Sequence, residues 1–138
     1  MFFKKNIKEK EIIFLPKIAA LLIHAAKIDE NFSEIEEKII ENTILQLGAK
    51  KEQIKNIIIE AKKIESDANQ ILDFTKEVKS LKEEDKIKIV EALWKIIYSN
   101  SEADIYETSL MRRLAGLLYV DSKTMGDIKE KIKAEVSK

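Results

Sequence analysis

The chain has 138 residues, with 25 basic and 25 acidic side chains, so its formal net charge is zero. This length fits one domain of ordinary size, which can bury a core without covalent crosslinks. The absence of cysteine excludes disulfides, thiolate metal sites and a cysteine nucleophile. A balanced chain also offers no global basic field, so we expect no binding to nucleic acid.

Residues 1–16 are predicted to form either an N-terminal extension or an extra helix. The most apolar stretch runs from Ile12 to Ala26, and Pro16 and Lys17 interrupt it. It falls short of the roughly 20 consecutive apolar residues that a membrane span needs. Acidic residues lie among the lysines where a secretory signal would be purely basic. We therefore expect a folded helix over 17–28, no transmembrane segment and a cytoplasmic location.

Apolar residues recur three and four positions apart through the rest of the chain, which predicts helices and no sheet. The clearest stripe consists of Ile54, Ile57, Ile58, Ala61 and Ile64. Capping boxes and a glycine after a helical stretch mark the boundaries. The sequence thus predicts an all-α fold, a compact bundle of about seven short helices. After the first, these cover 33–47, 51–65, 67–79, 82–99, 104–119 and 122–134.

Two conspicuous side chains are assigned structural roles. The helix predicted over 82–99 is apolar on most of its circumference, so we expect it to be central and Trp94 to be a core residue. His24 is the only histidine of the chain. Without a second histidine, a cysteine or a serine nearby, it supports neither a zinc site nor a catalytic triad, and we expect a solvated boundary residue.

An internal duplication with an offset of 71 residues marks the segment where function is expected. Two predicted inter-helix loops carry oxygen-bearing side chains at positions i, i+2, i+4 and i+7. These are Asp29, Asn31, Ser33 and Glu36 in the first copy, and Asn100, Glu102, Asp104 and Glu107 in the second. The two helix–loop–helix units are expected to pair about an approximate two-fold axis, which would bring the loops together.

Convergent oxygens of this kind are the ligands that Ca²⁺ and Mg²⁺ prefer. We therefore predict a divalent-cation site, with the second loop favoured because it has more carboxylates. The candidate ligands of this site, taken from both loops, are Asp29, Asn31, Glu36, Glu102, Asp104 and Glu107. The alternative is that Ser33 with Glu36, and Asp104 with Glu107, are only helix-capping boxes. Neither loop has the spacing or the central glycine of an EF-hand, and both interpretations stay open.

The stretch from Ala92 to Ile128 resembles the core of the TerB-like (tellurite resistance protein B) family. It matches at Leu93, Trp94, Tyr98, Glu102, Asp104, Tyr106, Glu107, Arg112, Arg113, Leu117, Leu118, Tyr119 and Val120. The first loop is similar to the family's N-terminal copy through Ala25, Ala26, Asp29, Phe32 and Glu36. The resemblance covers roughly residues 17–134, and we predict a single TerB-like domain over residues 1–138.

The resemblance implies pseudo-symmetric helical halves, an association with tellurite and stress resistance, and no established catalytic activity. It also implies a divalent-cation site at the acidic loops and a scaffold role with partner proteins at the inner face of the membrane. This sequence departs from the family pattern at five positions, which are Glu30, Asn100 and Ser101 in the loops and His24 and Lys95 on the preceding helices. A lysine beside a bound cation would repel it, which weakens the case for tight metal binding.

Arg112 and Arg113 are the only arginines in the chain. Arginine offers a planar, bidentate donor, so these two residues are candidate contacts to an acidic partner, a phosphate or another oxyanion. The alternative is an intramolecular ion pair with a helix carboxylate, worth under about 1 kcal/mol if exposed.

The predicted function is accordingly a non-enzymatic interaction scaffold that binds Ca²⁺ or Mg²⁺, or no cofactor at all. A purely structural interaction domain without a metal is the alternative. A hydrolase would need paired carboxyl groups in a concave pocket, and the sequence indicates no such pocket.

Overall fold

The computed structural model describes residues 15–27, 33–67, 74–75, 78–99 and 105–136. These residues contain helices and no strand, so the predicted all-α class is confirmed. After helical residues 15–26, the elements are α2 (Glu34–Gln46), the short 3₁₀ turn η2 (Lys51–Gln53), α3 (Ile54–Asp67), α5 (Glu83–Tyr98), α6 (Ile105–Leu117) and α7 (Ser122–Val136).

The predicted helix boundaries agree with the structure to within a few residues. Counting residues 15–26, six α-helices lie in the part of the chain that the structure describes, against the seven or so that the sequence predicts. The predicted helix at 67–79 falls largely outside the described residues, as does nearly all of the extension at 1–16. No helix that the structure describes has the length and apolar character needed to span a membrane.

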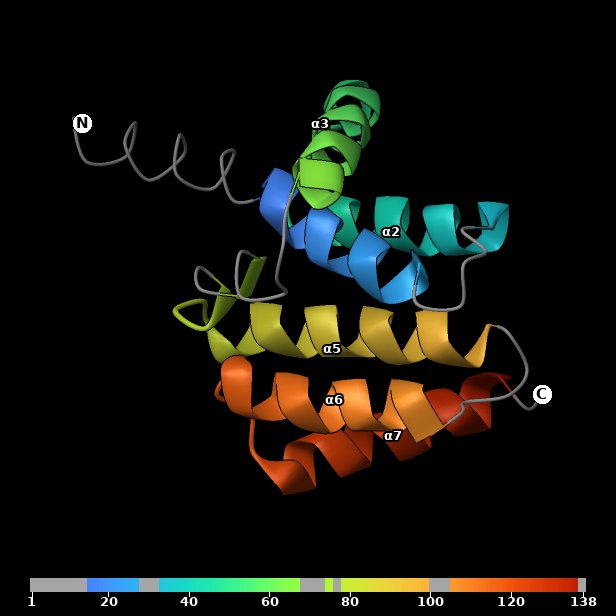
Figure 1. Ribbon diagram of the computed structural model, residues 1–138, viewed down its shortest axis with the longest axis vertical. Helices are drawn as coiled ribbons and strands as arrows, with labels where there is room; N and C mark the ends of the chain where they lie inside the picture. Colours follow the sequence, from blue (N-terminus) through green and yellow to red (C-terminus); the bar gives the residue numbers. More distant parts are fainter. Residues whose placement is uncertain (1–14, 28–32, 68–73, 76–77, 100–104, 137–138) are drawn as a thin grey trace.

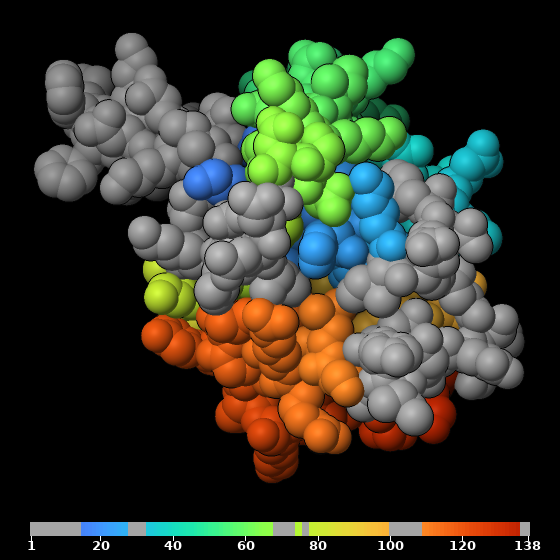
Figure 2. All heavy atoms as spheres, viewed as in Figure 1, coloured from blue at the N-terminus to red at the C-terminus, as the bar shows by residue number. Residues whose placement is uncertain are grey.

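The helices form two groups that meet along α5 (Figure 1). Residues 15–27, α2 and α3 form the first group, and α5, α6 and α7 form the second. Helix α5 contacts α2 on one side and α7 on the other. The space-filling view shows α6 and α7 covering one side of the molecule and α3 standing at the opposite side (Figure 2). The central position predicted for α5 is therefore confirmed.

Burial follows the apolar stripes of the sequence. Eight residues of α5 are buried, Trp94 among them, and so are Ile54, Ile57, Ile58 and Ala61 of α3. In residues 15–26 all side chains are buried except the half-buried Lys17 and His24. This first helix is apolar on nearly every face because it lies inside the molecule.

The internal duplication predicted from the loops extends to the helices. Helices α2 and α6 both have 13 residues, and each bound of α6 lies 71 positions after that of α2. Likewise α7 begins 71 positions after η2. The two halves of the chain therefore repeat one another in element length and in the connection that follows.

Both repeated helices end in a Schellman motif, in which a residue with positive φ turns the chain. After α2 this residue is Gly48, with φ 115°, and the Ala49 amide donates to the Ile44 carbonyl at 3.1 Å. After α6 the equivalent residue is Tyr119, with φ 57°, and the Val120 amide donates to the Ala115 carbonyl at 2.9 Å. The same backbone turn is thus formed by two very different residues.

Tyr119 is exposed, and it is the one non-glycine residue with positive φ in the described part of the chain. The ammonium groups of Lys79 and Lys86 lie 5.5 and 5.9 Å from the centre of its ring. Such cation–π contacts each contribute about 0.5–1 kcal/mol at exposed sites, which offsets part of the cost of the left-handed backbone.

Helix α7 begins with a side-chain cap that should make its stability depend on pH. The Thr124 amide donates to Asp121 Oδ1 at 2.7 Å, and the hydrogen bonds from Thr124 lower the pKa of Asp121 below its ordinary value of 3.8. Only the folded state has the lowered pKa. The cap therefore stabilises the fold fully at a pH above the ordinary pKa of the Asp121 carboxyl, and this stabilisation is lost as the pH falls through the pKa of Asp121 in the folded state.

We expect Asp121→Ala to melt at a lower temperature than the parent chain at neutral pH, with the difference shrinking in acid below the ordinary pKa of 3.8. Asp121→Asn keeps a capping oxygen that does not titrate, so its cap should persist in acid. Thermal melts followed by circular dichroism across a pH series test this. An alanine variant whose deficit stays constant into acid would contradict it.

Candidate functional site

Most of the predicted cation ligands lie where the structure gives no side-chain position. Asp29, Asn31, Glu102 and Asp104 lie outside the described residues. Glu107 lies in the first turn of α6, but its side chain is not described. Within the described ranges no three His, Cys, Asp or Glu side chains are grouped so as to hold a metal ion. Convergence of these ligands therefore remains a prediction.

Glu36 is the predicted ligand whose surroundings are defined. Its side chain is fully buried, at 0% exposure, although it lies in the first turn of α2. Its Oε1 accepts hydrogen bonds from Ser33 N at 2.9 Å and from Ser33 Oγ at 3.0 Å. The Glu36 amide donates to Ser33 Oγ at 3.2 Å, which completes the predicted capping box. A carboxylate buried to this degree is stable only where hydrogen bonds or cations compensate for its lost hydration.

The helix ends that flank the two acidic loops lie at the same end of the bundle (Figure 1). Residues 15–27 end there and α2 begins there, and likewise α5 ends there and α6 begins there. The opposite end of the α2–α5 pair is marked by Lys88 Nζ, which donates to the Gln46 carbonyl at 3.4 Å. Helices α2 and α5 are thus antiparallel neighbours, and both loops depart from a common face.

His24 contacts α3 as well as solvent, which adds to the predicted boundary role. Its side chain is 35% exposed, and its Nδ1 lies 3.3 Å from Glu65 Oε1. Lys27 Nζ donates to the other oxygen of Glu65 at 2.9 Å. The histidine ring also lies 5.7 Å from the ring of Phe74. The two contacts to Glu65 hold the first helix to α3, and they could not be predicted from local sequence patterns because Glu65 is 41 residues from His24.

Arg112 and Arg113 are both exposed on α6. Neither forms a salt bridge with a carboxylate in the ranges that the structure describes, so the intramolecular ion pair considered from the sequence is not seen there. Two exposed guanidinium groups on neighbouring residues could bind ligands outside the chain.

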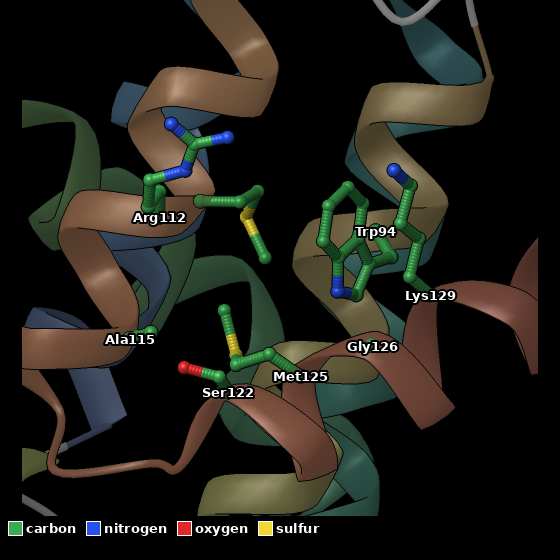
Figure 3. A pocket seen from close by; sticks show the side chains of 8 residues that line it. Trp94, Arg112, Ala115, Ser122, Met125, Gly126 and Lys129 are labelled. Atoms are coloured by element: carbon green, nitrogen blue, oxygen red, sulfur yellow. The ribbon is translucent and has the colours of Figure 1, made fainter.

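A pocket of about 220 Å³ lies between α5, α6 and α7 (Figure 3). The sequence did not indicate it. Its lining residues are Trp94, Met111, Arg112, Ala115, Ser122, Met125, Gly126 and Lys129. Trp94 is 3% exposed, as predicted for a core residue, yet it also forms a wall of this pocket. Among the described residues that line the pocket, none is acidic.

The surroundings of Trp94 are aromatic and cationic. Its ring stacks on that of Tyr98 with the centroids 5.9 Å apart, and Lys129 Nζ lies 5.5 Å from its centre. Burial, followed by the carboxylate of Glu130, raises the pKa of Tyr98 above its ordinary value of 10.0. The buried indole Nε1 has no hydrogen-bond partner among the described residues.

Comparison with protein families matches residues 16–130 to the family described as tellurite resistance protein TerB. The matched range contains both acidic loops, both repeated helices and the residues that line the pocket. Neither the curated proteins nor the solved structures include a match to this chain.

Proposed function

Because the chain belongs to the TerB family of tellurite resistance proteins, we propose that it is a non-enzymatic stress-response scaffold of the cytoplasm. In this proposal the face formed by the two acidic loops binds a partner protein at the inner side of the membrane. A Ca²⁺ or Mg²⁺ ion joins the loops and thereby fixes the shape of that face. Arg112 and Arg113, on the helix that follows the second loop, contribute contacts to acidic groups of the partner.

The observation that carries the proposal is the burial of Glu36 at the end of the bundle from which both loops depart. Acidic side chains in the first turn of a helix normally lie in water, where they interact with the helix dipole. Placing this carboxylate at 0% exposure has a cost, which the hydrogen bonds from Ser33 offset in part and a nearby cation would offset further.

The side chains at this end fit a hard cation in type. Glu36, Asp29, Asn31, Glu102, Asp104 and Glu107 would provide only oxygen ligands, which suits Ca²⁺ and Mg²⁺ and disfavours softer metals. A bound cation would supply positive charge between two loops that otherwise repel one another. Lys95 on α5, a position where the family has glutamate, would oppose such binding, so we expect affinity in the weaker range of oxygen-ligand sites.

The substitution Glu36→Gln distinguishes the role of Glu36 in cation binding from its role in capping α2. Glutamine also serves in a capping box, so the variant should keep its melting temperature in the presence of a chelator. In the parent chain, Ca²⁺ or Mg²⁺ at a hundredfold excess over the dissociation constant should raise the stability by about 2.7 kcal/mol. Charge attraction over about 4 Å is worth several kcal/mol at a protein surface, so the variant should bind at least about tenfold more weakly.

The measurement is thermal unfolding of the full chain with chelator, Ca²⁺ and Mg²⁺ in turn. Glu34→Gln is the matched control, because Glu34 lies in the same helical turn but is exposed. It should leave the metal-dependent shift nearly unchanged. A parent chain that melts at one temperature in all three solutions would exclude the cation.

The alternative is an interaction domain of the same family that binds no metal. The complete capping box of Ser33 and Glu36 supports it, because this motif explains the position of the Glu36 carboxylate without a cation. Partner binding that continues in chelator would favour this alternative. Loss of partner binding in Arg112→Gln/Arg113→Gln, with an unchanged melting temperature, would support the arginine contacts under either hypothesis.

A further inference from the structure

The pocket beside Trp94 is a place where the second half of the chain departs from the first. At the offset of 71 residues, Ala115 corresponds to Ile44 and Lys129 corresponds to Ile58. Both isoleucines are buried and fill the core of the first half. In the second half, a smaller side chain and a charged one occupy these positions, and a volume of about 220 Å³ is left open. At least two of the residues that line the cavity are therefore positions where the second copy differs from the first.

The indole of Trp94 brings an unsatisfied donor to this cavity. Trp94 is 3% exposed, and its Nε1–H has no acceptor in the described part of the chain. Buried N–H groups in folded proteins nearly always have a partner, so an exception indicates an acceptor that is supplied from outside the chain. The nitrogen faces the side of the pocket that Met125 and Gly126 form (Figure 3). A bound molecule with an oxygen at this point would complete the hydrogen bond.

Two cations border the same pocket. Arg112 is exposed on α6, and Lys129 is half-buried on α7, with its ammonium 5.5 Å from the centre of the Trp94 ring. Arg112 lies on one side of the Trp94 ring and Lys129 on the other (Figure 3). Among the residues that the structure describes, neither is in a salt bridge with a carboxylate, and none of those that line the pocket is acidic. The remaining lining is largely apolar, with the thioethers of Met111 and Met125.

We propose that this pocket is a binding site for a small organic carboxylate with a short apolar body. Arg112 and Lys129 attract the carboxylate, one of its oxygens accepts from Trp94 Nε1, and the apolar body packs against Met111 and Met125. The volume is below the roughly 300–1,000 Å³ of pockets that hold drug-sized molecules, which limits the ligand to one ring or a short alkyl chain. This site is separate from the acidic loops, and the inference does not rest on the proposed cation.

Straight-chain carboxylates from butanoate to octanoate test the proposal on the full chain. Trp94 is the only tryptophan, so its fluorescence reports on this pocket alone. We expect a saturable change and about a fourfold tighter dissociation constant for each added methylene until the pocket is full. The matching alcohols, which lack the charge, should bind at least about tenfold more weakly. Equal binding of acids and alcohols, or no saturable change with either, would overturn the proposal.

The indole N–H gives a second readout. In a ¹⁵N-labelled chain the single Trp94 Nε1–H signal should move to lower field as octanoate is added, because the proton gains an oxygen acceptor. A signal that stays in place while the fluorescence saturates would show that the ligand does not meet this donor, and the assigned geometry would then be wrong.

Two kinds of variant distinguish the contribution of charge to ligand binding from the contribution of the open volume. Arg112→Gln/Lys129→Gln should weaken octanoate binding about tenfold or more and remove the preference for acid over alcohol. Ala115→Ile copies the first half of the chain and should fill the pocket, so it should reduce the binding of acids and alcohols alike. Arg113→Gln is the matched control, because Arg113 is exposed on the same helix but does not line the pocket. Comparable losses in the control and in the Arg112→Gln/Lys129→Gln variant would overturn the site.

Discussion

Replacing Leu93 by alanine is expected to lower the free energy of unfolding by about 2–5 kcal/mol. Leu93 has 0% exposure and lies on α5, the helix that contacts α2 of the first half and α7 of the second. Deleting its side chain therefore removes buried apolar surface and leaves a cavity where the two halves meet. Urea denaturation measures the loss. Ile59→Ala is the control, because Ile59 is 62% exposed and the change should stay within about 0.5 kcal/mol.

The same variant tests whether the two halves unfold together. Circular dichroism follows all helices, whereas the fluorescence of Trp94 follows the second half. Because α5 packs against both groups, we expect the two probes to give one midpoint in the parent chain and one lower midpoint in Leu93→Ala. Separate midpoints in the parent chain would show that the halves are independent units and would contradict the coupling through α5.

Gly48→Ala is expected to destabilise the fold by about 1–3 kcal/mol. Its φ of 115° is a conformation that residues with a side chain rarely adopt, and it closes the turn after α2. A Cβ added at this position would have nothing within 4 Å, so the cost comes from the backbone and not from a clash. Chemical denaturation of the variant measures it.

Gly126→Ala is the matched control for this backbone argument. Gly126 lies within α7, and a Cβ there would also have nothing within 4 Å. Since alanine is the better helix former, this change should stabilise the fold by about 1 kcal/mol. If glycine-to-alanine lowers the free energy of unfolding at position 48 and raises it at position 126, the backbone conformation decides the effect. A Gly48→Ala chain as stable as its parent would contradict the assigned turn.

The helices could be predicted well because their signals are local. Apolar stripes, the Ser33–Glu36 capping box and Gly48 all act over one or two turns, and they located most helix ends to within a few residues. The end of α6 was predicted less accurately. The sequence predicts a helix to residue 119, whereas α6 ends at Leu117, since Tyr119 adopts the left-handed conformation without the glycine that usually signals it.

The two candidate sites were harder to predict from the sequence than the helices, and the reason differs between them. The cation site depends on how two loops converge, and only Glu36 of its ligands lies in the part with described side chains, so it stays a prediction. The pocket was missed because an apolar stripe indicates which side chains are buried but not whether they fill the space between helices. Its signal was the exchange of Ile44 for Ala115, which becomes visible only when the two halves are compared at their offset.

The repeat also suggests how such a chain can acquire new chemistry without losing its fold. In the first copy, the buried Ile44 and Ile58 fill positions that Ala115 and Lys129 occupy in the second, so the second copy has less apolar volume and one more charge at these positions. Each residue of the second copy can then be compared with the equivalent residue of the first. In proteins of this design, ligand specificity should be sought where the two copies disagree in side-chain volume or charge.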